Sequence, residues 1–98
     1  MRTMLRVWIP ADAGNRSMKD GSLQKTMGQA LERLRPEAAY FFPDQGERSA
    51  LMVFNLKDPS EIVAAAEPFF TGLNARLDLT PVMTADDLRA GMEALKGK

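Results

Sequence analysis

The stretch EAAYFFPDQGERSALMVFNL, residues 37–56, decides the fold because it predicts a β-hairpin. Residues 38–42 hold three aromatic side chains in succession, the pattern breaks at residues 43–46, and residues 49–56 resume as a largely apolar run. Proline, aspartate and glycine between two apolar runs are typical of a turn between antiparallel strands. A hairpin this apolar needs cover on both faces. We expect helices on one face and a second copy of the chain or a ligand on the other.

The residues before the hairpin predict a strand and then a helix. Residues 4–9 alternate with a period of two, which is typical of a strand ended by Pro10. A loop over residues 11–15 leads into helical spacing of leucine and methionine that begins near residue 16 and closes at Pro36. Gly21 inside that span predicts a kink or the start of a second helix. The strand face opposite its aliphatic residues carries Met4, Arg6 and Trp8.

The residues after the hairpin predict a helix, a strand and a final helix. Asp58 is placed to cap a helix with Pro59 at its first position and Glu61 reaching back to the cap. Residues 73–79 alternate again and predict the fourth strand. Residues 84–87, TADD, form a capping box before a short amphipathic helix. The apolar side of that helix carries Leu88, Met92 and Leu95.

The order of these elements is βαββαβ followed by α, which predicts an α+β, ferredoxin-like domain over residues 1–98. Two helices cover one face of such a sheet. The other face, with Arg6 and Trp8, has only the last helix left to cover it. An apolar sheet face is larger than the exposed patches that monomers usually carry. We therefore expect a homodimer formed through the sheet.

Composition excludes several classes of function. Thirteen basic residues balance 13 acidic ones, without the basic excess typical of nucleic-acid binding. The chain has no Cys and no His, which removes thiolate chemistry, the usual transition-metal ligands and the side chain most used for proton transfer near neutral pH. No long apolar run or signal-like segment occurs. We expect a cytoplasmic protein with no cofactor, no metal, and no membrane or nucleic-acid partner.

Six short stretches stand out along the chain: AGN (13–15), KDG (19–21), PEAAYF (36–41), EPFF (67–70), LNA (73–75) and TPVM (80–83). Together they resemble those of a group of small bacterial proteins of the dimeric α+β-barrel superfamily. That superfamily includes muconolactone isomerases and antibiotic-biosynthesis monooxygenases. The resemblance implies two ferredoxin-like protomers whose sheets enclose a small cavity, and it implies no particular activity. Some members of the superfamily bind haem or use His for proton transfer. The resemblance does not extend to these functions, because this chain contains no His.

Arg6 is the most informative candidate for a binding site, because a charge in the middle of a covered sheet face needs a partner. In a ferredoxin-like sheet the first and fourth strands are neighbours, so we expect Arg6 to meet Asp78. One interpretation is a structural ion pair. The other is that Arg6 and Arg76 present guanidinium groups to a carboxylate ligand in the cavity.

Aromatic residues of the same face are the next candidates. Trp8, Tyr40 and Phe42 are predicted either to line the cavity or simply to fill a core or dimer interface, and the Tyr40 hydroxyl is the best candidate for a proton donor. Asn15 lies where the first strand passes to its helix, and either caps that helix or helps to bind an anion.

The function predicted from the sequence is binding of a small anionic or aromatic molecule in the cavity of a dimeric barrel, without catalysis. The alternative is a cofactor-independent isomerase or monooxygenase that acts on a small organic acid. Whether the chain is an enzyme stays open at this point.

Overall fold

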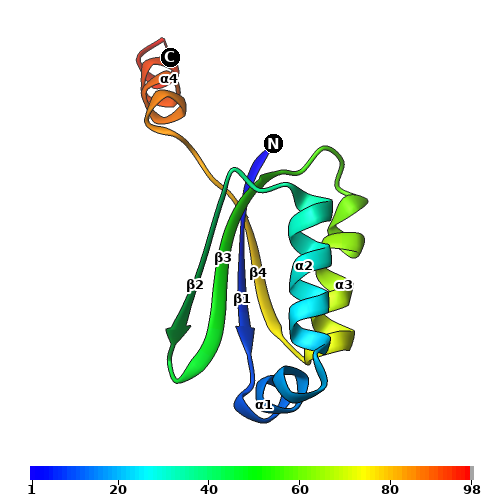
Figure 1. The fold of residues 1–98 in the computed structure, drawn as a ribbon. Coiled ribbons are helices and arrows are strands. Elements are labelled where there is room, and N and C mark those ends of the chain that lie inside the picture. The colour runs from blue at the N-terminus through cyan, green and yellow to red at the C-terminus, as the bar shows by residue number, and fades with distance from the viewer. Residues whose placement is uncertain (98) are drawn as a thin grey trace.

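The structure, a computed structural model, describes residues 1–97 and contains a four-stranded antiparallel sheet with strand order β2-β3-β1-β4. Helices α2 and α3 lie side by side on one face of this sheet (Figure 1). This confirms the α+β, ferredoxin-like βαββαβ arrangement with an additional C-terminal helix. The elements are β1 (Arg2–Ile9), α1 (Ala11–Asp20), α2 (Ser22–Leu34), β2 (Ala38–Asp44), β3 (Glu47–Asn55), α3 (Glu61–Leu73), β4 (Arg76–Pro81) and α4 (Ala85–Lys96).

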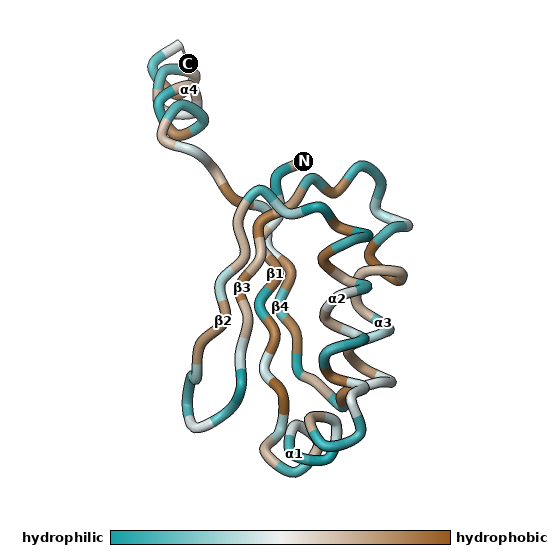
Figure 2. Tube along the Cα trace, in the orientation of Figure 1, coloured by the Kyte–Doolittle hydropathy of each residue, from teal (hydrophilic) through white to brown (hydrophobic). Residues whose placement is uncertain are grey.

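The hydrophobic core lies between the sheet and these two helices. Leu5 and Val7 of β1 and Met52 of β3 point toward the helices and are fully buried, together with Phe69 of α3. Figure 2 shows the hydrophobic residues of the strands and of the facing helices. Burying a side chain of this size stabilises a fold by about 1.5–3 kcal/mol. The alternating residues of β1 that do not enter this core must point to the opposite face.

The hairpin predicted from residues 37–56 is confirmed, with a tighter turn than expected. The strands continue to Asp44 and Glu47, and only Gln45 and Gly46 form the turn, with φ of 53° and 77°. Two successive positive φ angles are typical of the type I′ turn, which matches the twist of the flanking strands. Pro43 therefore belongs to β2, where an edge position tolerates its missing N–H.

Residues 11–15 were predicted as a loop, and this prediction was wrong, because they begin the ten-residue helix α1. The first turn closes when the amide of Gly14 donates to the carbonyl of Pro10 at 2.8 Å. Pro10 supplies a fixed φ just before the helix, and Asp12 puts a negative charge in its first turn. Gly21, with φ of 81°, ends α1, so the second helix start predicted there is confirmed.

The fourth strand begins later than predicted. Leu73 is the last residue of α3 rather than part of a strand, and Asn74 ends that helix in the left-handed conformation with φ of 51°. Asparagine tolerates this conformation better than most residues, which fixes the helix end at this position. At the other end, the helix begins at Glu61, two residues after the predicted Pro59, and the carboxylate of Glu61 accepts from the amide of Asp58 as expected.

The C-terminal helix α4 stands apart from the rest of the described chain. Its predicted capping box is confirmed, because the Thr84 hydroxyl accepts from the amide of Asp87 and the Asp87 carboxylate accepts from the amide of Thr84. None of its residues is buried, and Figure 1 shows it beyond the end of the sheet and away from α2 and α3. Among residues 1–97, no helix combines the length and the apolar character that crossing a membrane would need.

Candidate binding face of the sheet

The sheet face that α2 and α3 do not cover carries the predicted site residues in ordered rows, and we call it the open face. The strand register places Tyr40, Leu51, Arg6 and Asp78 opposite one another in one row. The next row consists of Phe42, Ser49, Trp8 and Arg76. Ala38, Val53, Met4 and Thr80 form a third row, and Asp44 and Glu47 form a fourth at the end of the hairpin.

Trp8 lies at the centre of a charged cluster on the open face. The Cζ atom of Arg6 is 4.7 Å from the centroid of the indole ring, and the Cζ atom of Arg76 is 4.6 Å from it. Each such cation–π contact is worth about 0.5–1 kcal/mol at an exposed site. These neighbours leave Trp8 only 6% exposed, although no helix covers it. The indole is therefore covered in part by guanidinium groups of its own chain.

The carboxylate of Asp44 contacts both Trp8 and Arg6 in this cluster. Its Oδ2 accepts a hydrogen bond from Trp8 Nε1 at 2.8 Å and lies 3.6 Å from Arg6 Nη2. Asp78 lies directly opposite Arg6 in the register, as predicted. The predicted ion pair between these two residues was wrong, because Arg6 pairs with Asp44 instead. Asp44 was missed because the sequence placed it in the turn. The sequence feature that could have placed Asp44 in a strand is its position beside a proline, which an edge strand tolerates.

Arg76 has a carboxylate partner of its own but keeps most of its surface free. Its Nη2 lies 3.4 Å from Glu47 Oε1, and its side chain is 61% exposed. Arg6 differs, because its Nε is buried without a hydrogen-bond acceptor among the described residues. Leaving a buried donor unpaired costs about 1–3 kcal/mol. The cluster thus contains one unpaired donor and one accessible guanidinium, both next to the indole.

The remaining predicted site residues divide into two groups. Tyr40 shares a row with Arg6 and is 63% exposed, and no described residue hydrogen-bonds its hydroxyl. Asp78 is exposed in the same row. Asn15 does not join them, because it lies on α1 and its Oδ1 accepts from Arg48 Nη1 at 3.0 Å. Arg48 is opposite Ile9, on the face of the sheet that carries the helices.

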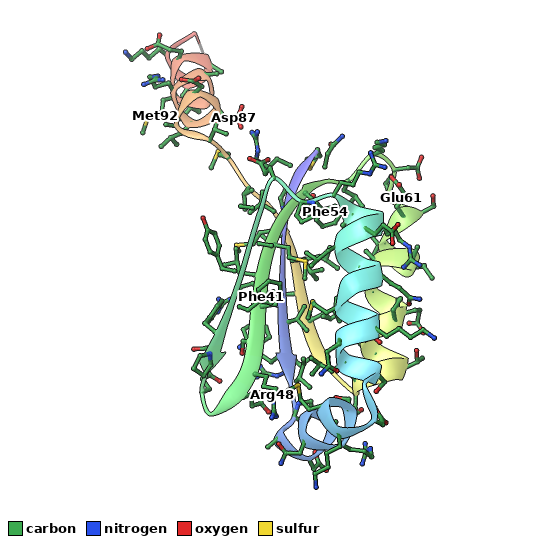
Figure 3. All side chains as sticks on the ribbon, in the orientation of Figure 1. Phe41, Arg48, Phe54, Glu61, Asp87 and Met92 are labelled. Atoms are coloured by element: carbon green, nitrogen blue, oxygen red, sulfur yellow. The ribbon has the colours of Figure 1, made fainter. Side chains whose placement is uncertain are left out.

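A groove of about 460 Å³ on that helix-covered face was not predicted. Its lining includes residues of α2 and β2, and Phe41 of β2 is 54% exposed there. Figure 3 labels Phe41 and Arg48 on the two strands of the hairpin. The lining residues are Ile9, Leu23, Met27, Phe41, Phe42, Pro43, Arg48 and Ser49.

Comparison with known proteins supports the fold and leaves the function open. No protein-family model matches this chain, and no curated protein sequence matches it. Among solved structures, a formyltetrahydrofolate deformylase from Pseudomonas putida KT2440 is similar, with a TM-score of 0.55 and 16% sequence identity. The match covers 84% of this chain and 29% of the deformylase chain. At this level of identity the likeness concerns the fold alone.

Proposed function

We propose that the chain is a homodimeric binding protein whose two open faces pack together and enclose a site for a small aromatic monocarboxylate. The observation that carries the proposal is the pair of guanidinium groups, those of Arg6 and Arg76, that lie over the ring of Trp8 on the open face. A carboxylate oxygen is the acceptor that a guanidinium N–H binds most strongly. The exposed guanidinium of Arg76, over the same ring, supplies further donors.

The apolar rows on either side of the cluster favour a second protomer as the cover. Antiparallel sheets commonly leave one face in water, but that face is then mostly polar. Here Tyr40 is exposed, and Met4, Leu51 and Val53 are only half-buried. A second sheet packed over these residues would remove them from water and leave a dry space around the arginines, where their interaction with an anion is strengthened.

The charges of the open face restrict the ligand. Asp44 and Glu47 already neutralise the two arginines, and Asp78 adds a further negative charge in the row of Arg6. A ligand with one carboxylate can satisfy the free donors, whereas a second carboxylate would meet this acidic surround. The aromatic part of the ligand would rest against Tyr40 and its neighbours.

A binding titration tests this proposal. We expect benzoate to raise the melting temperature of the protein and to shift the Trp8 indole NMR signal, with no comparable effect from neutral benzyl alcohol or from the dicarboxylate phthalate. Arg76→Gln should weaken benzoate binding at least fivefold, because Arg76 is exposed enough to be replaced without unfolding the chain. The matched control is Arg16→Gln on the exposed surface of α1. Equal binding of benzoate and benzyl alcohol, or unchanged binding by Arg76→Gln, contradicts the proposal.

A further inference from the structure

The C-terminal helix has an apolar side that nothing in the described chain buries. Leu88, Met92 and Leu95 follow the i, i+4, i+7 spacing of one helix face and are 46%, 57% and 72% exposed. We call these three residues the α4 stripe. An isolated helix of 12 residues is marginal in water, even when it is well capped. The stripe therefore needs a surface to pack against.

The connection to β4 directs α4 away from its own sheet. The amide of Val82 donates to the carbonyl of Arg2 at 3.1 Å, so the chain is held to β1 up to that residue. Only Met83 and Thr84 remain before the helix begins, and Thr84 is extended, with φ of −79° and ψ of 173°. Two residues span about 7 Å, and here they continue outward instead of reversing the chain. The helix thus lies beyond the sheet, where α2 and α3 are out of reach (Figure 1).

A second copy of the chain is the partner that fits this arrangement. From strand spacing and rise, the open face measures roughly 20 Å by 19 Å in outline. Stable interfaces bury about 800 Å² of accessible surface per partner, so a dimer formed through a sheet of this size is strengthened by further contact area. A helix that extends the protomer to 56 Å in its long dimension, against 28 Å and 18 Å in the others, supplies additional surface at the end of the proposed sheet interface.

We propose that α4 is an arm exchanged between protomers: its stripe packs on the partner protomer at the edge of the paired sheets and closes one end of the space between them. This inference rests on the dimer of the proposed function. The helix of each protomer then contributes residues to the wall of the partner's binding site.

Dissociation of the dimer tests the arm. We expect the triple variant Leu88→Ser, Met92→Ser, Leu95→Ser to raise the dimer dissociation constant at least tenfold by sedimentation equilibrium. The control, Arg89→Ser with Glu93→Ser on the polar side of α4, should stay within twofold of the wild type. Because α4 contributes no buried residue, unchanged amide NMR shifts of α2 and α3, on the sheet face away from the proposed interface, can verify that the body of each variant is folded. A dimer unaffected by the triple variant overturns the arm and leaves the sheet interface standing. A monomeric wild type overturns both.

A spin label locates the arm directly. The chain has no Cys, so Glu93→Cys gives a single attachment site opposite the stripe. The spin-labelled chains, which carry no ¹⁵N, are mixed with ¹⁵N-labelled wild-type chains. We expect the spin label to broaden the amide signals of the open-face strands in the ¹⁵N-labelled protomers. If these amides are not broadened in a sample that is dimeric by mass, the exchange of α4 is contradicted.

Discussion

Trp8 is held by charged residues from three other positions on the open face: Arg6 on its own strand, Arg76 on β4 and Asp44 on β2. The alternation of residues 4–9 was enough to predict that Arg6 and Trp8 share a face. It was not enough to predict the partner of Arg6, because a turn placed at residues 43–46 removed Asp44 from the sheet. The two-residue turn at Gln45 and Gly46 returns Asp44 to a strand.

Replacing Trp8 measures how much this cluster stabilises the fold. We expect Trp8→Phe to lower the free energy of unfolding by about 1–2 kcal/mol, because the hydrogen bond to the Asp44 carboxylate is lost and a smaller aromatic ring replaces the indole. Urea unfolding followed by circular dichroism at a fixed protein concentration checks this value. The control Arg16→Gln alters an exposed side chain of α1, away from the open face, and should change stability by less than about 0.5 kcal/mol. A Trp8→Phe protein as stable as the wild type would show that the indole N–H contributes nothing.

Among the elements, those with strong periodicity or turn residues were predictable, and those that depend on their surroundings were not. The hairpin and the α4 capping box follow from local residue patterns. The helix α1 was missed because Gly14 and Asn15 are typical of a loop when no neighbours are considered. In the fold, a Cβ atom at Gly14 would lie 2.7 Å from Arg48 Nη1, so the glycine lets that side chain pack against the helix. The start of β4 was misplaced because the alternation of residues 73–79 crosses a helix end.

The cap of α4 makes this helix sensitive to acid. Hydrogen bonds from the backbone amide and the side chain of Thr84 lower the pKa of Asp87. A carboxyl whose pKa is lower in the folded state stabilises the helix above its unfolded pKa, and this stabilisation is lost as the pH falls through the folded value. We expect the helical ¹³Cα shifts of residues 85–90 to decrease below about pH 4. Asp87→Asn should weaken this pH dependence, and an unchanged profile in that variant would contradict the assignment to Asp87.

At the scale of the whole molecule, the described chain is extended for its length. Its radius of gyration is 15.8 Å, against about 13 Å for a typical compact domain of 100 residues. The sequence correctly predicted the topology, because the order of strands and helices allows few arrangements. It predicted a last helix but not its separation from the sheet, since an amphipathic pattern indicates that a face will be buried and not which chain buries it.

The central claim is that a second protomer covers the open face. Isotope-filtered NOE spectroscopy on a mixture of ¹³C-labelled and unlabelled chains tests this claim most directly. The account predicts intermolecular NOEs to the methyl groups of Met4, Leu51 and Val53. A monomeric mass at the NMR concentration, or a dimer with no intermolecular NOE to these three residues, would contradict it.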